Sequence, residues 1–132
     1  MKKLLATIFA TMLMIGCGGS NEEQTVAKIH FAKKSGATAL ELHANQLTDI
    51  TPLANLTDLT MLGLGLNQIT DITPLAELTN LKILWLSDNQ IANVMPLAKL
   101  TKLRTLYLAR NPIPDDQKAM LRKALPNCEI EF

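Results

Sequence analysis

Few side chains in this chain have the type and spacing needed for catalytic or metal chemistry. The 132 residues include two histidines, His30 and His43, and two cysteines, Cys17 and Cys128. Neither histidine has a cysteine or a pair of carboxylates at metal-ligand spacing, and no group of side chains has the spacing of a catalytic site. The sequence therefore predicts no enzyme, no metal and no cofactor, and both histidines are interpreted as surface or cap residues.

The first cysteine lies directly after a segment typical of protein export. Residues 1–3 form a short positive region, residues 4–15 are an uninterrupted apolar or small stretch, and Gly16 precedes Cys17. The apolar stretch is shorter than the ~20 residues that a helix needs to cross a bilayer. Residues 1–16 are therefore predicted to be a signal peptide and not part of the folded domain.

The four residues Met14-Ile15-Gly16-Cys17 resemble the bacterial lipobox. The resemblance implies cleavage before Cys17, a diacylglycerol on its sulfur and usually an acyl chain on its new amino group, which together anchor a protein to a membrane. A plain secretory signal and an uncleaved anchor are the alternatives. The expected location is the bacterial cell envelope. In a Gram-negative cell the outer membrane is favoured, because Gly18 is not the aspartate associated with inner-membrane retention; in a Gram-positive cell the plasma membrane is expected.

The composition of the chain after cleavage argues against nucleic-acid binding and against an intramolecular disulfide. Removing residues 1–16 takes away two of the 13 lysines and arginines, so 11 basic residues face 12 acidic ones. The net charge of about −1 gives no indication of nucleic-acid binding. With Cys17 lipidated, Cys128 has no intramolecular disulfide partner. The apolar neighbours of Cys128 predict a buried structural thiol.

A pattern with a period of 22 residues runs through the rest of the chain. Leucines return at Leu40, Leu62, Leu84 and Leu106, and again at Leu42, Leu64, Leu86 and Leu108. The same spacing is kept by Asn45, Asn67, Asn89 and Asn111, and by the prolines Pro52, Pro74 and Pro96. So many positions in one register predict a solenoid in which each unit is one strand and one return segment, and in which neighbouring units share a continuous core.

The form L-x-x-L-x-L-x-x-N-x-I is that of a leucine-rich repeat. The wording of residues 67–81, Asn-Gln-Ile-Thr-Asp-Ile-Thr-Pro-Leu-Ala-Glu-Leu-Thr-Asn-Leu, closely resembles the internalin-like repeats of bacterial surface proteins. An α/β fold is expected, a short solenoid of about four repeats with a parallel, concave sheet. The resemblance also implies a binding role, but it identifies no partner, because different sites occur on one fold.

The segments around the repeats are expected to form caps. Residues 17–24 are small and polar and are predicted to be a flexible tether. Residues 25–36 place apolar residues at a roughly helical spacing and end at Gly36, which predicts an N-terminal cap helix over the first repeat. The repeats occupy residues 37–113. Residues 114–132 are predicted to close the core as a C-terminal cap of one helix and a final strand.

The concave face of the sheet is the predicted binding surface. Alternate strand residues point away from the core, so Trp85 and Tyr107, the only tryptophan and tyrosine, are expected side by side on adjacent strands. A hollow beside them is expected where Gly63 and Gly65 lack side chains. The candidate partner-binding residues are Met61, Leu66, Ile83, Trp85, Asp88, Tyr107 and Arg110.

Two interpretations of this face remain open. In the first, the protein is a lipid-anchored envelope protein that binds a protein or peptide as a monomer or weak homo-oligomer. In the second, Trp85 and Tyr107 only stabilise the sheet, and the protein is a structural or self-associating envelope module without a separate ligand. Asp88 and Arg110 are expected to form a weak surface pair. The four repeat asparagines are predicted to form a ladder that bonds to the backbone where the chain turns.

Overall fold

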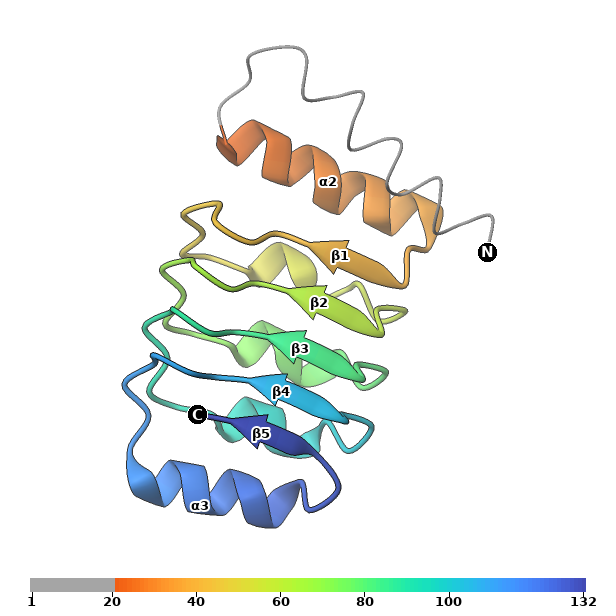
Figure 1. Cartoon of the computed structure of the whole chain (residues 1–132). Coiled ribbons are helices and arrows are strands. Elements are labelled where there is room, and N and C mark those ends of the chain that lie inside the picture. The colour runs from red at the N-terminus through yellow and green to blue at the C-terminus, as the bar shows by residue number, and fades with distance from the viewer. Residues whose placement is uncertain (1–20) are drawn as a thin grey trace.

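The computed structural model describes residues 21–132, which form a short solenoid (Figure 1). Its elements in order are α2 (Asn21–Ser35), β1 (Ala39–Glu41), η1 (Thr51–Leu53), β2 (Met61–Gly63), η2 (Thr73–Glu77), β3 (Ile83–Trp85), η3 (Met95–Lys99), β4 (Thr105–Tyr107), α3 (Asp115–Ala124) and β5 (Glu129–Glu131), where η marks a 3₁₀ helix. The predicted signal peptide and the lipidation of Cys17 lie outside the described residues. No helix within residues 21–132 is long and apolar enough to span a membrane.

The five strands form one parallel sheet in the order β1-β2-β3-β4-β5, and the 3₁₀ helices lie behind it (Figure 1). The 22-residue period sets the register of the first four strands. The direct cross-strand neighbours in the core are Leu40, Leu62, Leu84, Leu106 and Ile130. The three central leucines of this row are fully buried. The predicted leucine-rich-repeat solenoid, with a helical cap at one end and a helix-strand cap at the other, is confirmed.

The repeat asparagines join neighbouring repeats through their side-chain amides. Asn67 Oδ1 accepts hydrogen bonds from the backbone N–H groups of Asn45 and Leu47, both at 3.0 Å. Its Nδ2 donates to the carbonyls of Leu42 at 3.0 Å and Leu64 at 2.8 Å. One buried amide thus satisfies backbone groups from two repeats, at the point where the strand ends and the chain turns.

The ladder continues toward the C-terminus and stops at the first repeat. Asn89 and Asn111 each bond one backbone N–H of the preceding repeat and backbone carbonyls of both repeats. Asn45 belongs to the first repeat, which is preceded by helix α2 and not by another repeat. Its Nδ2 donates to the carbonyl of His43, two residues earlier, at 2.7 Å. The four asparagines therefore share a position but not an equal number of contacts.

An aspartate or asparagine lies two residues before each 3₁₀ helix and bonds the first residue of that helix. Its side-chain Oδ1 accepts the backbone N–H: Asp49 from Thr51 at 2.9 Å, Asp71 from Thr73 at 2.9 Å, and Asn93 from Met95 at 3.0 Å. The proline that follows fits the first turn, where its missing N–H is not needed. The threonine hydroxyl, and then the threonine N–H, hold the pKa of Asp49 and of Asp71 below the ordinary value.

The stability of the protein should therefore fall in acid through these two carboxylates. Because their folded pKa lies below the unfolded value of about 3.9, they stabilise the fold above that pH, and the stabilisation is lost as the pH falls through the folded pKa. Asn93 accepts the same backbone hydrogen bond without a charge, so the double variant Asp49→Asn, Asp71→Asn should keep the 3₁₀ helices and lose part of this dependence. Urea midpoints measured from about pH 6 to pH 3 test this, and parallel profiles for the two proteins would contradict it.

Helix α2 begins earlier than the sequence predicts. It starts at Asn21, so residues 21–24 of the predicted tether are helical, and Glu22 and Glu23 occupy its first turn. Carboxylates at this position stabilise a helix through its dipole, which the interpretation of a polar tether overlooked. The helix ends at Ser35, and Gly36 directly after it has a φ of +62°, the left-handed conformation expected of this glycine.

The packing of α2 also differs from the apolar spacing in its sequence. Thr25 and Ala32 are buried and Ile29 packs against the core, so the inward face follows a spacing of three or four residues. Val26, which is one of the apolar residues of this segment, is 61% exposed. The cap therefore covers the first repeat with a narrow face that includes a threonine.

At the other end, α3 covers the last 3₁₀ helix. Leu121 is fully buried, and Gln117 Oε1 accepts the backbone N–H of Val94 at 3.1 Å. Cys128 is only half-buried, in contrast to the buried thiol that was predicted. Desolvation raises the pKa of this thiol, against the opposing effect of Arg104, so it is less reactive than an ordinary exposed cysteine.

Candidate functional site

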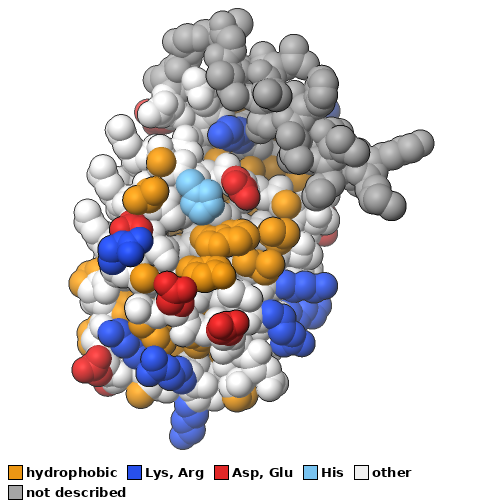
Figure 2. Space-filling model, in the orientation of Figure 1, with side chains coloured by type: hydrophobic (Ala, Val, Ile, Leu, Met, Phe, Trp, Pro, Cys, Tyr) orange, Lys and Arg blue, Asp and Glu red, His pale blue; other side chains and the backbone are white. Residues whose placement is uncertain are grey.

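The concave face presents the strand residues that alternate with the buried leucines. One row across the strands consists of Ala39, Met61, Ile83, Thr105 and Glu129, and the next consists of Glu41, Gly63, Trp85, Tyr107 and Glu131. Figure 2 shows an apolar cluster at the middle of this face, with acidic side chains above and below it and Lys or Arg side chains along one border. The surface is therefore apolar at its centre and charged at its rim.

Trp85 and Tyr107 stack with nearly parallel rings on adjacent strands. Their ring centroids are 6.1 Å apart and the ring planes differ by 2°. Met61 and Ile83 lie in the neighbouring row and, like the two rings, are half-buried. The four side chains form an apolar platform that also carries the indole N–H and the phenol O–H, two polar groups at the edge of apolar rings.

The hollow predicted at the two glycines is filled by His43, so that prediction is wrong. A Cβ built on Gly63 would lie 2.3 Å from His43 Nε2, and the Gly65 N–H donates to His43 Nδ1 at 3.0 Å. The other side of the imidazole meets Trp85 edge to face, with 6.2 Å between the centroids. The 22-residue period places His43 opposite Gly65. Because Gly65 has no side chain, the sequence could have predicted that the imidazole occupies this space.

Substituting alanine for Gly63 should displace the imidazole. The new methyl group and the ring cannot both fit, so Gly65 loses its acceptor, and the free energy of unfolding should fall by about 1 kcal/mol. The neutral ring of the parent protein should carry its proton on Nε2, because Nδ1 accepts a hydrogen bond. Urea unfolding gives the stability, and nitrogen NMR shifts give the tautomer of His43.

The control for this change is the same substitution in a His43→Ala background. There the three atoms nearest to the new methyl group, all from the His43 ring, are gone, so Gly63→Ala should have a much smaller effect on stability. An equal loss of stability in both backgrounds would show that the glycine is needed for its backbone and not for the imidazole.

The residue before each repeat asparagine has a left-handed backbone. These residues are Ala44, Leu66, Asp88 and Arg110, with φ between 54° and 59°. This conformation costs about 1–2 kcal/mol for a side chain such as leucine. Leu66 nevertheless occupies it, and its side chain is 61% exposed. It is a large apolar group held at the rim of the concave face without burial of its own.

Asp88 and Arg110 pair at the same rim through two hydrogen bonds. Arg110 Nε donates to Asp88 Oδ1, and Arg110 Nη2 donates to Asp88 Oδ2 at 2.6 Å. The guanidinium holds the pKa of Asp88 below its usual range, and the carboxylate raises the pKa of Arg110. The Arg110 side chain is 71% exposed, so solvent screens the pair and its contribution to stability is small.

Sequence reasoning missed two residues of this face, Glu129 and Glu131. The structure aligns them with Thr105 and Tyr107 on β4, as the last members of the two concave rows. Both glutamate side chains are exposed. The alternation of Glu129, Ile130 and Glu131 along a final strand was the signal that could have placed both carboxylates on the concave side.

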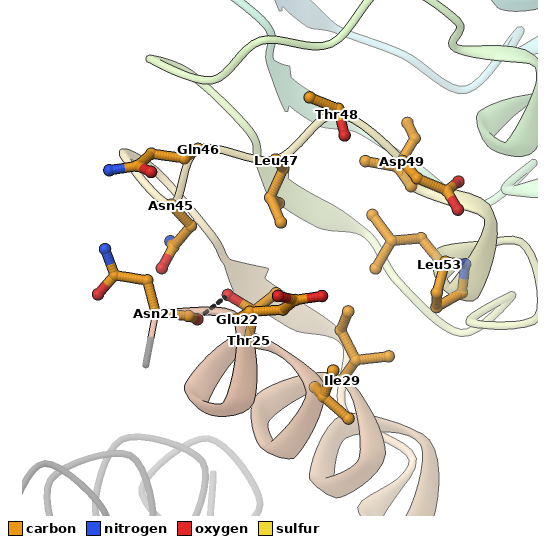
Figure 3. A pocket seen from close by; sticks show the side chains of 13 residues that line it. Asn21, Glu22, Thr25, Ile29, Asn45, Gln46, Leu47, Thr48, Asp49 and Leu53 are labelled. Atoms are coloured by element: carbon orange, nitrogen blue, oxygen red, sulfur yellow. Dashed lines mark hydrogen bonds between the residues drawn. The ribbon is translucent and has the colours of Figure 1, made fainter. Parts of the chain in front are cut away.

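A cleft lies between α2 and the first repeat (Figure 3). This cleft has a volume of about 540 Å³. In Figure 3, Ile29, Leu47 and Leu53 form its apolar part, and Glu22 and Asp49 carry its carboxylates. The described residues that line it include no histidine, cysteine, lysine or arginine. Within residues 21–132, no group of three or more metal-ligating side chains is placed to hold a metal ion.

Comparison with known families agrees with this geometry. Residues 38–77 and 79–118 match the family described as Leucine Rich repeats (2 copies). The chain belongs to the leucine-rich-repeat family. Solenoids of this kind offer an extended concave surface for binding. No protein with a curated function matches the chain closely enough to count as a relative.

Solved structures with the same fold include bacterial leucine-rich-repeat proteins. Internalin C2 of Listeria monocytogenes is 46% identical, with a TM-score of 0.66 over 70% of this chain and 40% of that chain. Internalin F of the same bacterium is 34% identical, with a TM-score of 0.72 over 79% of this chain and 30% of that chain. A leucine-rich-repeat protein of Leptospira interrogans is 29% identical, with a TM-score of 0.71 over 79% and 27%. The leucine-rich-repeat chain is thus internalin-like, and it spans less than half the length of these proteins.

Proposed function

We propose that this chain is a non-enzymatic, lipid-anchored protein of the bacterial cell envelope that binds a protein or peptide partner through its concave face. The observation that carries the proposal is the stacked pair of Trp85 and Tyr107 at the centre of that face. The lipobox-like residues 14–17 support the anchor on Cys17. That anchor would hold the protein on the outer membrane of a Gram-negative cell or on the plasma membrane of a Gram-positive cell.

The composition of the face supports contact with another macromolecule. Aromatic residues and methionine are enriched where protein interfaces gain most of their binding energy, and here Met61 and Ile83 flank the two rings. Leu66 adds an exposed apolar side chain at the rim. Exposed apolar groups that lie together on a soluble protein generally mark a surface that is covered by a partner.

One observation favours a second function, that of a structural or self-associating envelope module. The rings of Trp85 and Tyr107 lie almost parallel, which lets them stabilise the sheet as a cross-strand pair without a ligand. A face that covers itself in a homodimer would make the size of the protein depend on its concentration. Sedimentation at several concentrations separates this function from binding of a different partner.

The double variant Trp85→Ala, Tyr107→Ala should lose partner capture and stay folded. Both rings are only half-buried, so their loss removes contact area on the face without emptying the leucine core. The protein without residues 1–17, bound to a resin, is exposed to bacterial envelope extract beside the double variant. Met95→Ala is the matched control, because Met95 is 50% exposed in η3, on the side of the solenoid opposite the sheet.

Retention of a partner by the parent and by Met95→Ala, but not by the folded double variant, would support a binding site at the aromatic pair. Unfolding of the double variant, seen by circular dichroism, would indicate that the pair is structural. If all the folded proteins retain nothing and their size rises with concentration, self-association is the better explanation.

A further inference from the structure

The concave sheet carries carboxylates that form no ion pair within residues 21–132. Its five strands contain Glu41, Glu129 and Glu131 and no lysine or arginine. All three side chains are exposed. Within residues 21–132 the ion pairs involve other carboxylates. The face is therefore an apolar platform with available carboxylates at its two ends (Figure 2).

The carboxylates of β5 stand beside the open side of the aromatic pair. Tyr107 stacks one ring face on Trp85 of β3, so its other face is turned toward β5. Glu131 is the direct cross-strand neighbour of Tyr107, at a strand spacing of ~4.8 Å. The other side of Trp85 is already in contact with His43. A ring face of Tyr107 that is not stacked on Trp85 thus adjoins the exposed carboxylate of Glu131, which forms no ion pair within residues 21–132.

We propose that this place binds an arginine side chain of the partner, so that the protein recognises basic segments. The inference rests on the partner-binding function proposed above. A guanidinium group stacks on an aromatic ring and donates two parallel hydrogen bonds to a carboxylate. Tyr107 supplies the ring, Glu131 supplies the carboxylate, and Glu129 adds negative charge from the same strand. The chain makes such a ring contact itself, since the Arg122 guanidinium lies 4.8 Å from the centroid of Phe132.

Among the described residues, three cations near this place, Lys82, Arg104 and Arg110, form no ion pair with its glutamates. Arg110 is engaged by two hydrogen bonds to another carboxylate, and Glu131 makes only a minor contribution to its raised pKa. Lys82 and Arg104 directly precede β3 and β4, at the edge where the strands begin. An acidic partner would meet the glutamates with like charge, whereas an arginine would complete the site.

Peptide titration tests this place directly. The probe is a flexible glycine-serine peptide that contains two arginines, and the signal is the fluorescence of Trp85, the only tryptophan. The comparison peptides carry glutamine or glutamate in place of arginine. We expect only the arginine peptide to bind, and we expect its affinity for Glu131→Gln to be about tenfold weaker than its affinity for the parent protein. Glu77→Gln removes the same charge from η2, on the side of the solenoid opposite the sheet, and it should change the affinity by less than about twofold.

Three results would overturn the arginine site: equal binding of the three peptides, no binding of the arginine peptide by the folded protein, or equal effects of the two variants. The partner-binding function fails separately from it. A partner that is lost with the Trp85 and Tyr107 double variant but retained by Glu131→Gln supports that function and removes the arginine site. A partner that is lost with Glu131→Gln and retained by Glu77→Gln supports both.

Discussion

Replacing Leu84 by alanine should lower the free energy of unfolding by about 2–5 kcal/mol. The Leu84 side chain is fully buried in the central strand β3, and its cross-strand neighbours are Leu62 and Leu106. Repeats pack against it from both sides, so the core cannot collapse into the space that the substitution creates. The loss should therefore include both the transfer of the leucine side chain and the cost of a cavity. Urea unfolding followed by circular dichroism measures it.

Leu66→Ala is the matched control for this prediction. It removes the same atoms from a leucine that is 61% exposed, so the free energy of unfolding should change by no more than about 0.5 kcal/mol. A similar loss for the two variants would contradict a core that is shared between repeats. A change in the slope of the urea transition, and not only in its midpoint, would show that repeats unfold separately.

The period of 22 residues made the core of this protein predictable. Leu62, Leu84 and Leu106 are one period apart in the sequence and one strand apart in the structure. Because each unit repeats the same path, spacing along the chain becomes position in space. The same arithmetic placed Trp85 beside Tyr107, and the structure has them in direct register.

The period could not predict how different side chains at equivalent positions of neighbouring repeats pack against each other. Gly63 and Gly65 lack side chains, and the sequence alone predicted a hollow there. The structure fills it with His43, since an imidazole on the preceding strand can lean across the space that two glycines leave. Such a contact depends on the rotamer of one side chain and not on its position in the repeat.

The glutamates of β5 were missed because the spacing changes at the C-terminal cap. Trp85 and Tyr107 are 22 residues apart, but Tyr107 and its neighbour Glu131 are 24 apart, since helix α3 replaces the shorter 3₁₀ segment of a repeat. The row of the candidate site therefore ends in a residue that the repeat spacing does not reach. The alternation along β5 indicates which side the two glutamates face, but their alignment with Thr105 and Tyr107 came from the strand pairing.

Replacing Asn67 by alanine should lower the free energy of unfolding by about 3 kcal/mol or more. The Asn67 side chain is 8% exposed, and its amide bonds the N–H groups of Asn45 and Leu47 and the carbonyls of Leu42 and Leu64. Alanine leaves the N–H groups of Asn45 and Leu47 and the carbonyl of Leu42 without their amide partner, and an unsatisfied buried group costs about 1–3 kcal/mol. The carbonyl of Leu64 keeps its hydrogen bond from Asn89 Nδ2, so it adds little to the loss.

Asn45→Ala is the control that the chain itself provides. Asn45 has the same position in the first repeat, but within residues 21–132 its side chain bonds only the carbonyl of His43, and Asn45 is more exposed than Asn67. Its loss should therefore cost less than about 1 kcal/mol. Equal costs at the two positions would show that the asparagine acts within its own turn and does not join repeats.

Asn67→Asp separates the two halves of the amide. Aspartate keeps the oxygen that accepts from the backbone N–H groups of Asn45 and Leu47, but its second oxygen faces the carbonyls of Leu42 and Leu64 where the amide donated. At neutral pH a negative charge would point at two carbonyl oxygens in a nearly dry turn, so Asn67→Asp should be at least as unstable as Asn67→Ala. An aspartate variant close to the parent in stability would mean that the acceptor half alone holds the repeats together.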